Sequence, residues 1–359
     1  MTLLETIIIA IVEGLTEFLP VSSTGHMIIT QNLLGVTERM QDDPTMAAFV
    51  HAFTFIIQFG AILSVVCLYW KQFFQFDNTT VFNNERTGTA GKHFYRDLNN
   101  KMVAGVLSGF ALYTNTNVLF WRLGTVLLSF FGGIGLLVYI IMAIAMPSLE
   151  KPSWLQSIRH KYYFYWLLIV GVIPAVVIGL AAKKSGLLDW LLDSVLVVAI
   201  MLVLGGIFML YCDKIFNKPD EKREVTERSA FNIGLFQCIS VIPGVSRSMA
   251  TIVGGMAQGL TRRRAAEFSF FLAVPTMAGA TVLDLFDLMK EGGAWATTSN
   301  ITMLIVGCVV AFIVALLAMK WFVNFVSKYG FKAFGIYRII VGLIILVLIF
   351  TGHSLSMVD

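Results

Sequence analysis

The sequence predicts an all-α polytopic membrane protein. Hydrophobic residues make up 57% of the chain, charged residues make up only 13%, and the mean hydropathy is +0.79. A soluble domain carries about 25% charged residues, whereas a run of about 20 apolar residues is long enough to span a bilayer as a helix. The apolar runs here are continuous rather than alternating, which excludes a transmembrane β-barrel. The net charge of +4 is typical of basic cytoplasmic loops and does not indicate a nucleic-acid partner.

About six core transmembrane helices are expected from the long apolar segments. We place them at 46–69, 162–182, 194–211, 266–289, 301–322 and 334–351. Two further apolar segments, 1–35 and 229–260, are interrupted by Pro, Gly and hydroxyl residues. Irregular backbone at membrane depth is tolerated only where it is buried in protein or faces a cavity. These two segments are therefore expected to form re-entrant helix pairs.

The two interrupted segments resemble each other when the numbering is shifted by 224. LPVSSTGHMIITQNLLG (19–35) then aligns with PGVSRSMATIVGGMAQG (243–259). Three predicted spans follow each segment. Because each half then crosses the membrane an odd number of times, the second half has the opposite orientation to the first. This arrangement is an inverted repeat, in which the broken helices of the two halves meet near the midplane of the membrane.

We therefore expect a single integral membrane domain over 1–359. Repeat one comprises 1–71 and 162–212, repeat two comprises 229–351, and 72–161 is an insertion. For the insertion we expect an even number of extra crossings, with a helix along the membrane surface as the alternative.

The distribution of basic residues predicts the orientation. Most of the 26 Lys and Arg residues fall after Trp70, after Cys212, at 260–265 and at 320–338. Loops rich in Lys and Arg lie in the cytoplasm. Both termini and the opening of the first interrupted segment are then expected on the outer side.

Ionisable side chains are concentrated in the first interrupted segment. Glu13 and Glu17 are four residues apart, as are Ser22 and His26, while Ser23 and His26 are three apart. Residues at these spacings share one face of a helix. An ionisable group inside the bilayer costs from about 2.5 kcal/mol upward, which favours a functional site over simple packing.

The second interrupted segment carries a phosphate-binding pattern, because Ser246, Arg247 and Ser248 open a predicted helix and Thr251 follows one turn later. Arginine, hydroxyls and backbone N–H groups at a helix start bind phosphate. A divalent cation, Mg²⁺ or Ca²⁺, would relieve repulsion between the two carboxylates of the first segment. These features together predict phosphoryl transfer from an anionic substrate with a lipid tail. A transporter or flippase for a lipid phosphate or another anion is the alternative, because inverted repeats are also transporter architecture.

Several stretches resemble undecaprenyl-diphosphate phosphatase, the bacitracin-resistance family. They are VEGLTEFLPVSSTGHM, IIQFGAIL, IPAVVIGL, PGVSRSMAT, EFSFFLAVPTMAGAT and IYRIIVG, and they cover about residues 1–70 and 165–350. The resemblance implies a phosphoric anhydride hydrolase that converts the lipid diphosphate to the monophosphate carrier for peptidoglycan and other wall polymers and confers bacitracin resistance. It also implies a divalent-metal requirement and an interdigitated inverted repeat.

The resemblance also assigns roles to residues. It places the family's acidic motif on Glu13 and Glu17, and its serine and histidine on Ser23 and His26. The sequence leaves open whether the nucleophile is Ser23 activated by His26, His26 itself or a water activated by Glu17. The chain departs from the family pattern at Val245, at Met249 and in the insertion. The catalytic candidates are Glu17, Ser23, His26 and Arg247, and the substrate-binding candidates are Ser246, Arg247, Ser248 and Thr251.

The expected partners are a polyprenyl diphosphate lipid and the bilayer, with no nucleic acid and with a homodimer left open. The expected location is the bacterial cytoplasmic (inner) membrane, with a multi-pass chain and an active site that opens to the outer, periplasmic side.

Overall fold

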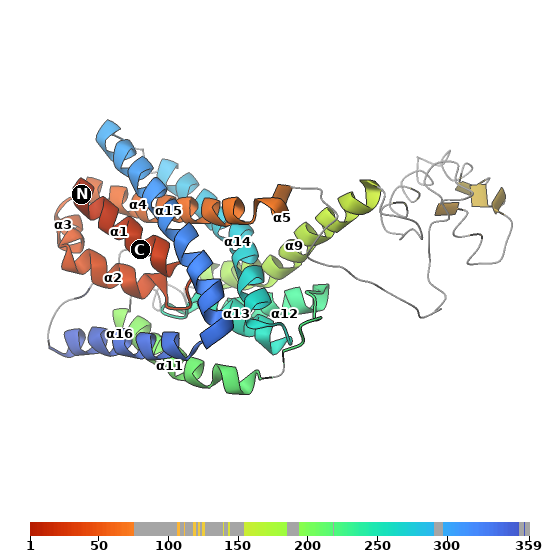
Figure 1. Cartoon of the computed structure of the whole chain (residues 1–359). Helices are drawn as coiled ribbons and strands as arrows, with labels where there is room; N and C mark the ends of the chain where they lie inside the picture. The colour runs from red at the N-terminus through yellow and green to blue at the C-terminus, as the bar shows by residue number, and fades with distance from the viewer. Residues whose placement is uncertain are drawn as a thin grey trace. The chain divides into compact units, whose positions relative to one another are not determined.

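A computed structural model describes residues 1–74, 154–184, 194–217, 219–290 and 297–351, together with Leu355 and scattered residues between 106 and 143 (Figure 1). The described part is helical and contains no strand. The chain divides into two compact units, one formed by Met1–Trp70 with Leu167–Asp359 and the other by Lys71–Trp166. The predicted insertion at 72–161 falls largely outside the described residues, and so do its expected crossings.

The first unit is built from long helices and two pairs of short ones. The long helices are α4 (Pro44–Leu68), α9 (Trp154–Lys184, whose first residues belong to the second unit), α11 (Val195–Ile215), α14 (Arg262–Lys290), α15 (Thr298–Tyr329) and α16 (Lys332–Phe350). The short pairs are α1 (Leu3–Thr16) with α2 (Ser23–Leu33), and α12 (Glu227–Gln237) with η1 (Cys238–Val241) and α13 (Arg247–Ala257). Short helix α3 (Val36–Asp42) follows α2, and α5 (Trp70–Phe74), which belongs to the second unit from Lys71 on, follows α4.

Six helices in the described residues are long and apolar enough to cross a membrane. They are Pro44–Leu68, Tyr162–Gly179, Val195–Ile215, Arg262–Val282, Thr298–Tyr329 and Lys332–Phe350. Each contains most of one predicted span, so the prediction of six core spans is confirmed.

The two short pairs have matching bounds at the shift of 224. Helix α2 covers 23–33 and α13 covers 247–257, while α1 begins at 3 and α12 at 227. Thr2 and Thr226 are equivalent N-caps, and each closes a capping box with the residue three positions on, Glu5 or Ser229. The same local interactions therefore start both pairs.

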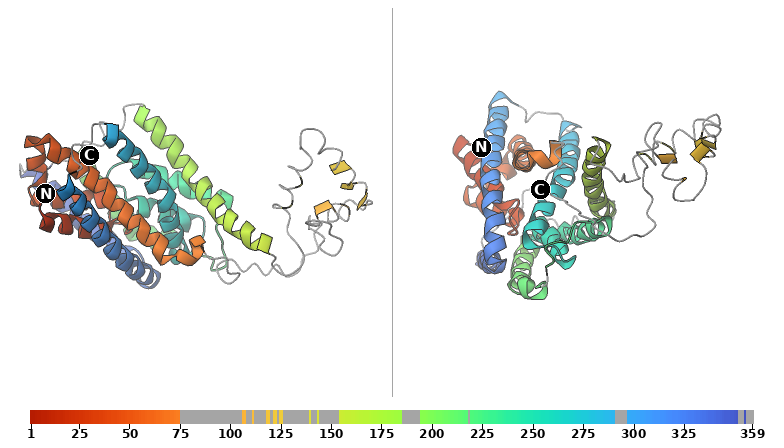
Figure 2. Two further views of the ribbon diagram at one scale, coloured as in Figure 1. Left: turned by 90° about the horizontal axis from the view of Figure 1, so that it is seen from above. Right: turned by 45° about the vertical axis from the view of Figure 1, so that its right-hand side comes forward.

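Each short pair packs against a long helix of the other repeat. Gly14 of α1 lies so close to α15 that an added Cβ would stand 2.8 Å from the carbonyl oxygen of Ala311. On the other side, Gly234 of α12 packs against Gly171 and Pro174 of α9. Helix α4 lies beside α15 in both Figures 1 and 2. The two repeats are thus interleaved, and neither re-entrant pair has a complete core within its own half.

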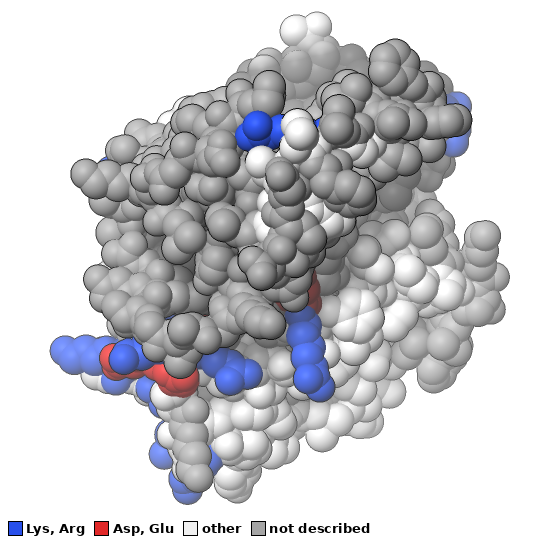
Figure 3. All heavy atoms as spheres, turned by 90° about the vertical axis from the view of Figure 1, so that its right-hand side faces the viewer, with Lys and Arg blue, Asp and Glu red and all other residues white. Residues whose placement is uncertain are grey.

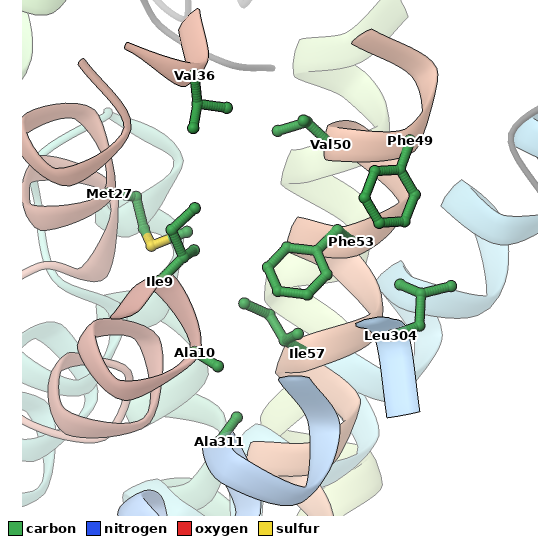
Figure 4. Packing of buried hydrophobic residues seen from close by; sticks show 10 residues of the cluster. All are labelled: Ile9, Ala10, Met27, Val36, Phe49, Val50, Phe53, Ile57, Leu304 and Ala311. Atoms are coloured by element: carbon green, nitrogen blue, oxygen red, sulfur yellow. The ribbon is translucent and has the colours of Figure 1, made fainter. Parts of the chain in front are cut away.

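A hydrophobic cluster anchors the first pair. It joins α1, α2 and α3 to α4 and α15, with the side chains pointing into the space between these helices (Figure 4). Its buried members are Ile9, Ala10, Met27, Val36, Phe49, Val50, Phe53, Ile57, Leu304 and Ala311.

Helix ends rich in basic residues meet on one side of this unit. Asp213, near the end of α11, accepts 2.8 Å hydrogen bonds from Arg262 Nε at the start of α14 and from the N–H of Phe331 between α15 and α16. Lys and Arg side chains gather at the lower left of Figure 3. The basic residues at these helix ends are Lys214, Arg262, Arg263, Arg264, Lys328 and Lys332.

Gly60 and Gly279, each in the interior of a long helix, test this packing. An added Cβ at Gly60 of α4 would lie 2.5 Å from the carbonyl oxygen of Cys308, whereas one at Gly279 of α14 would meet nothing within 4 Å. Overpacking costs about 1–3 kcal/mol, so Gly60→Ala should lower the melting temperature in detergent by several degrees. Gly279→Ala is the matched control and should leave it unchanged or slightly higher. Equal melting temperatures in the two variants would contradict the close approach of α4 and α15.

Candidate functional site

The first re-entrant pair turns at residues 17–22. Ser22 has a φ of +71° and is the only non-glycine residue with positive φ in the described part of the chain. Such a conformation is unfavourable for an L-residue and persists only when its surroundings hold it. The strained turn places Ser23 at the first position of α2.

The second pair turns at Pro243 and Gly244. Gly244 has a φ of +85°, and an added Cβ would lie 2.5 Å from the carbonyl oxygen of Val198, so both the backbone conformation and the space require glycine. Ser246 then caps α13, because its Oγ accepts a hydrogen bond of 3.3 Å from the N–H of Met249.

The first turn is held by side chains from outside its own pair. Its backbone carbonyls lie beyond the last turn of α1 and have no partner within that helix. Three successive carbonyls accept from distant donors: Phe18 from Ser248 Oγ at 2.9 Å, Leu19 from Ser246 Oγ at 3.4 Å, and Pro20 from Arg338 Nη1 at 3.2 Å.

Charged groups of the two turns also pair. Arg247 Nη2 lies 3.2 Å from Glu17 Oε1, and both side chains are largely buried. The other oxygen of Glu17 accepts a 2.7 Å hydrogen bond from Ser23 Oγ. The guanidinium of Arg247 also lies 5.8 Å from the centre of the Phe18 ring. Glu17 therefore joins the hydroxyl of one turn to the cation of the other.

Glu13 and Arg247 keep unused bonding capacity. Glu13 is 1% exposed, and neither of its carboxylate oxygens has a hydrogen-bond partner among the described residues. Within the same set of residues, Arg247 Nη1 is buried without an acceptor. Buried polar groups are normally paired. The unpaired carboxylate oxygens suit a hard divalent cation, and the unpaired N–H group suits an anionic oxygen.

Both ring nitrogens of His26 have partners other than Ser23. Its Nδ1 lies 2.7 Å from the carbonyl oxygen of Ser22, and its Nε2 lies 2.7 Å from the Tyr337 hydroxyl. A carbonyl only accepts, so Nδ1 is assigned the hydrogen, and the neutral ring accepts from Tyr337 at Nε2. The two rings are also stacked, with centroids 5.5 Å apart. The sequence left His26 open as the base for Ser23, but the structure pairs Ser23 with Glu17.

The predicted phosphate-binding hydroxyls are engaged within the protein. Ser246 and Ser248 donate to the first turn, as described above. Thr251 Oγ1 lies 2.6 Å from Ser269 Oγ and donates to the carbonyl of Arg247 at 2.9 Å. Within the second turn, Arg247 is thus the predicted binding residue that retains a free donor.

Two site residues were missed in the sequence. The stretch IYRIIVG contains Tyr337 and Arg338, but Arg338 was counted with the cytoplasmic loop at 320–338. The structure corrects this assignment, because Arg338 lies in α16, is 0% exposed and contacts the first turn. An arginine inside an apolar helix is itself a signal of function, and it was available in the sequence.

Known proteins resemble this chain along its whole length. A family model described as "Bacitracin resistance protein BacA" matches residues 6–158 and 141–344. Proteins named undecaprenyl-diphosphatase are 44% identical over 357 residues in Porphyromonas gingivalis W83 (99% of this chain, 100% of the relative) and 40% identical over 358 residues in Flavobacterium psychrophilum (100% of both). A third, from Bdellovibrio bacteriovorus, is 37% identical over 365 residues (100% of both). The region 72–161 is therefore shared with these relatives, which corrects its interpretation as a departure from the family.

Proposed function

The chain belongs to the bacitracin resistance protein family, and on this premise we propose that it hydrolyses undecaprenyl diphosphate to undecaprenyl phosphate and inorganic phosphate. The observation that carries the proposal is the partly buried group formed by Ser23, Glu17 and Arg247, in which a hydroxyl, a carboxylate and a cation are in direct contact between two re-entrant turns. The reaction returns the lipid carrier to wall-polymer synthesis, and the family's name associates it with resistance to bacitracin.

The contact between Ser23 and Glu17 supports a two-step reaction. Ser23 Oγ attacks the terminal phosphorus while its proton passes to Glu17 Oε2, 2.7 Å away. The bond from that phosphorus to the bridging oxygen breaks, and undecaprenyl phosphate leaves with that oxygen and takes up the proton. In the second step Glu17 accepts a proton from water, and the water oxygen attacks the phosphoserine. The Ser23 oxygen leaves, regains a proton and releases inorganic phosphate. Direct attack by His26 gains no support, because both of its ring nitrogens are engaged.

Arg247 would stabilise the charge that develops on the phosphoryl oxygens. Its Nη2 is engaged by Glu17, but its buried Nη1 is free to bind an oxygen of the terminal phosphate. Its position at the start of α13 adds the N-terminal end of a helix, which favours negative charge.

Glu13 and Glu17 would hold a divalent cation, Mg²⁺ or Ca²⁺. The cation would neutralise charge on the diphosphate and polarise the bond that breaks. Both oxygens of Glu13 are buried without partners, so the residues fit such an ion. No group of three or more His, Cys, Asp or Glu side chains that could hold a metal occurs in the described residues. The remaining ligands would then come from the substrate and from water.

Phosphate release tests the proposed function. Purified protein in detergent, where no compartment exists, should release phosphate from undecaprenyl diphosphate, whereas a transporter would release none. Arg247→Lys should lose most of this activity, because an ammonium lacks the planar fork that contacts Glu17 and phosphate together. Arg228→Lys, at an exposed site, is the matched control and should retain full activity. Near-normal turnover in Arg247→Lys would remove Arg247 from the site.

Chelation tests the metal. Excess chelator should abolish hydrolysis, and Mg²⁺ or Ca²⁺ should restore it. Glu13→Gln should raise the metal concentration needed for half-maximal activity, because a neutral amide is a weaker ligand for a hard cation. Full activity in excess chelator would show that the two carboxylates have another role, such as proton transfer.

We propose that the chain lies in the bacterial inner membrane with its basic helix ends in the cytoplasm. The first re-entrant pair then enters from the outer side, and the site opens toward the periplasm. A homodimer stays a prediction.

Thiol labelling in intact cells tests this orientation. Thr37 in the same outer segment is buried in α3, so the exposed Gln41 is the better position for a cysteine. After replacement of the native cysteines, Gln41→Cys should react with an impermeant thiol reagent and Lys222→Cys should not. The reverse pattern would invert the topology.

A further inference from the structure

Arg338 is a completely buried cation without an acidic partner. It is 0% exposed and is the largest fully buried side chain in the described part of the chain. It forms no ion pair with any residue that the structure describes. A buried charge is costly unless other groups satisfy it, so its contacts indicate what it does.

The guanidinium of Arg338 connects both re-entrant turns. Its Nη1 donates to the carbonyl of Pro20 in the first turn at 3.2 Å, and its Nη2 donates to the carbonyl of Gly244 in the second turn at 2.9 Å. A third hydrogen bond, from Nη2 to the carbonyl of Met201 at 3.2 Å, ties the same group to α11. One rigid planar group thus contacts both turns and a membrane-spanning helix.

A glycine on α11 makes room for this group. An added Cβ at Gly205 would lie 2.6 Å from Nη2 and 3.1 Å from Cζ of Arg338. Any other residue at 205 would displace the guanidinium from the carbonyls that it joins. The position of the Arg338 guanidinium from α16 therefore depends on the space left by Gly205 on α11.

The reacting groups are divided between the two turns. The first turn carries Glu17 and leads into Ser23, and the second leads into Arg247. Their mutual distances depend on how the turns are placed, and a misplacement of about 1 Å can cost about 100-fold in rate. We propose that Arg338 is a positioning residue that sets the placement of the two turns, and with it the alignment of Ser23, Glu17 and Arg247. This inference rests on the proposed hydrolysis.

The kinetic test uses variants that disturb the link in different ways. Gly205→Ala keeps Arg338 but fills the space that its guanidinium occupies. Arg338→Lys keeps the positive charge but removes the planar guanidinium. Arg338→Met removes both the charge and the guanidinium. Each should lower kcat per folded molecule by about 10- to 100-fold and leave KM within about threefold. The control Gly279→Ala, at a helix position with open space, should retain wild-type kcat. Gly205→Ala should have no further effect when Arg338 is already Met, because it acts through that side chain.

A distance measurement separates positioning from general destabilisation. Spin labels at the exposed positions Thr24 and Ile239, in a background without native cysteines, report the separation of the two pairs. The distribution should be narrow in the wild type and in Gly279→Ala, and broader or shifted in Gly205→Ala and Arg338→Met. Unchanged distances, unchanged kcat or additive losses in the double variant would overturn the proposal. Absence of phosphate release by the wild type would instead refute the proposed function, while the distances would still decide whether Arg338 places the turns.

Discussion

The backbone carbonyls of the turn that follows α1 control the arrangement of this protein. A helix that ends in water leaves its last carbonyls to the solvent, but at bilayer depth each unsatisfied group costs several kcal/mol. The chain meets this cost with donors from far along the sequence. Ser246 and Ser248 come from the opposite repeat, and Arg338 comes from the last long helix. The fold therefore requires the two broken pairs to meet.

The same contacts bring the chemical groups together. Ser248 binds the carbonyl of Phe18, the residue directly after Glu17, and Arg247 directly precedes Ser248. The hydrogen bond that satisfies the backbone thus holds Arg247 within 3.2 Å of Glu17. Glu17 in turn contacts Ser23 across a strained turn. The hydrogen bonds that pair the backbone carbonyls of the turn therefore also hold the hydroxyl of Ser23 and its neighbours in place for reaction.

The two repeats have matching helices but carry different reactive residues. At the shift of 224, Glu13 corresponds to Gln237 and Ser23 to Arg247, and the position of Glu17 is taken by an apolar residue. Repeating the acidic pair would bury four carboxylates around one point, where their mutual repulsion and desolvation would be severe. One half instead supplies the carboxylates and the hydroxyl, and the other supplies the cation. The capping boxes at Thr2 and Thr226 show that the helix starts remained alike while the site residues diverged.

Local pattern determined much of this molecule. Hydropathy identified the six spans, the match between 19–35 and 243–259 identified the two broken pairs, and ionisable groups in apolar surroundings identified Glu13, Glu17, His26 and Arg247. The spans and the broken pairs are confirmed, because apolar runs and helix-breaking residues are recognised from neighbouring residues in the chain, whereas the roles of the four ionisable residues stay predictions. The partners of those groups depend on contacts between segments far apart in the chain, such as the hydrogen bond between Arg338 and Pro20. Only the tertiary structure decided that Ser23 pairs with Glu17, that His26 turns to Tyr337, and that Arg338 is a buried link and not part of a loop, because spacing along one helix does not determine which distant donor reaches a free carbonyl.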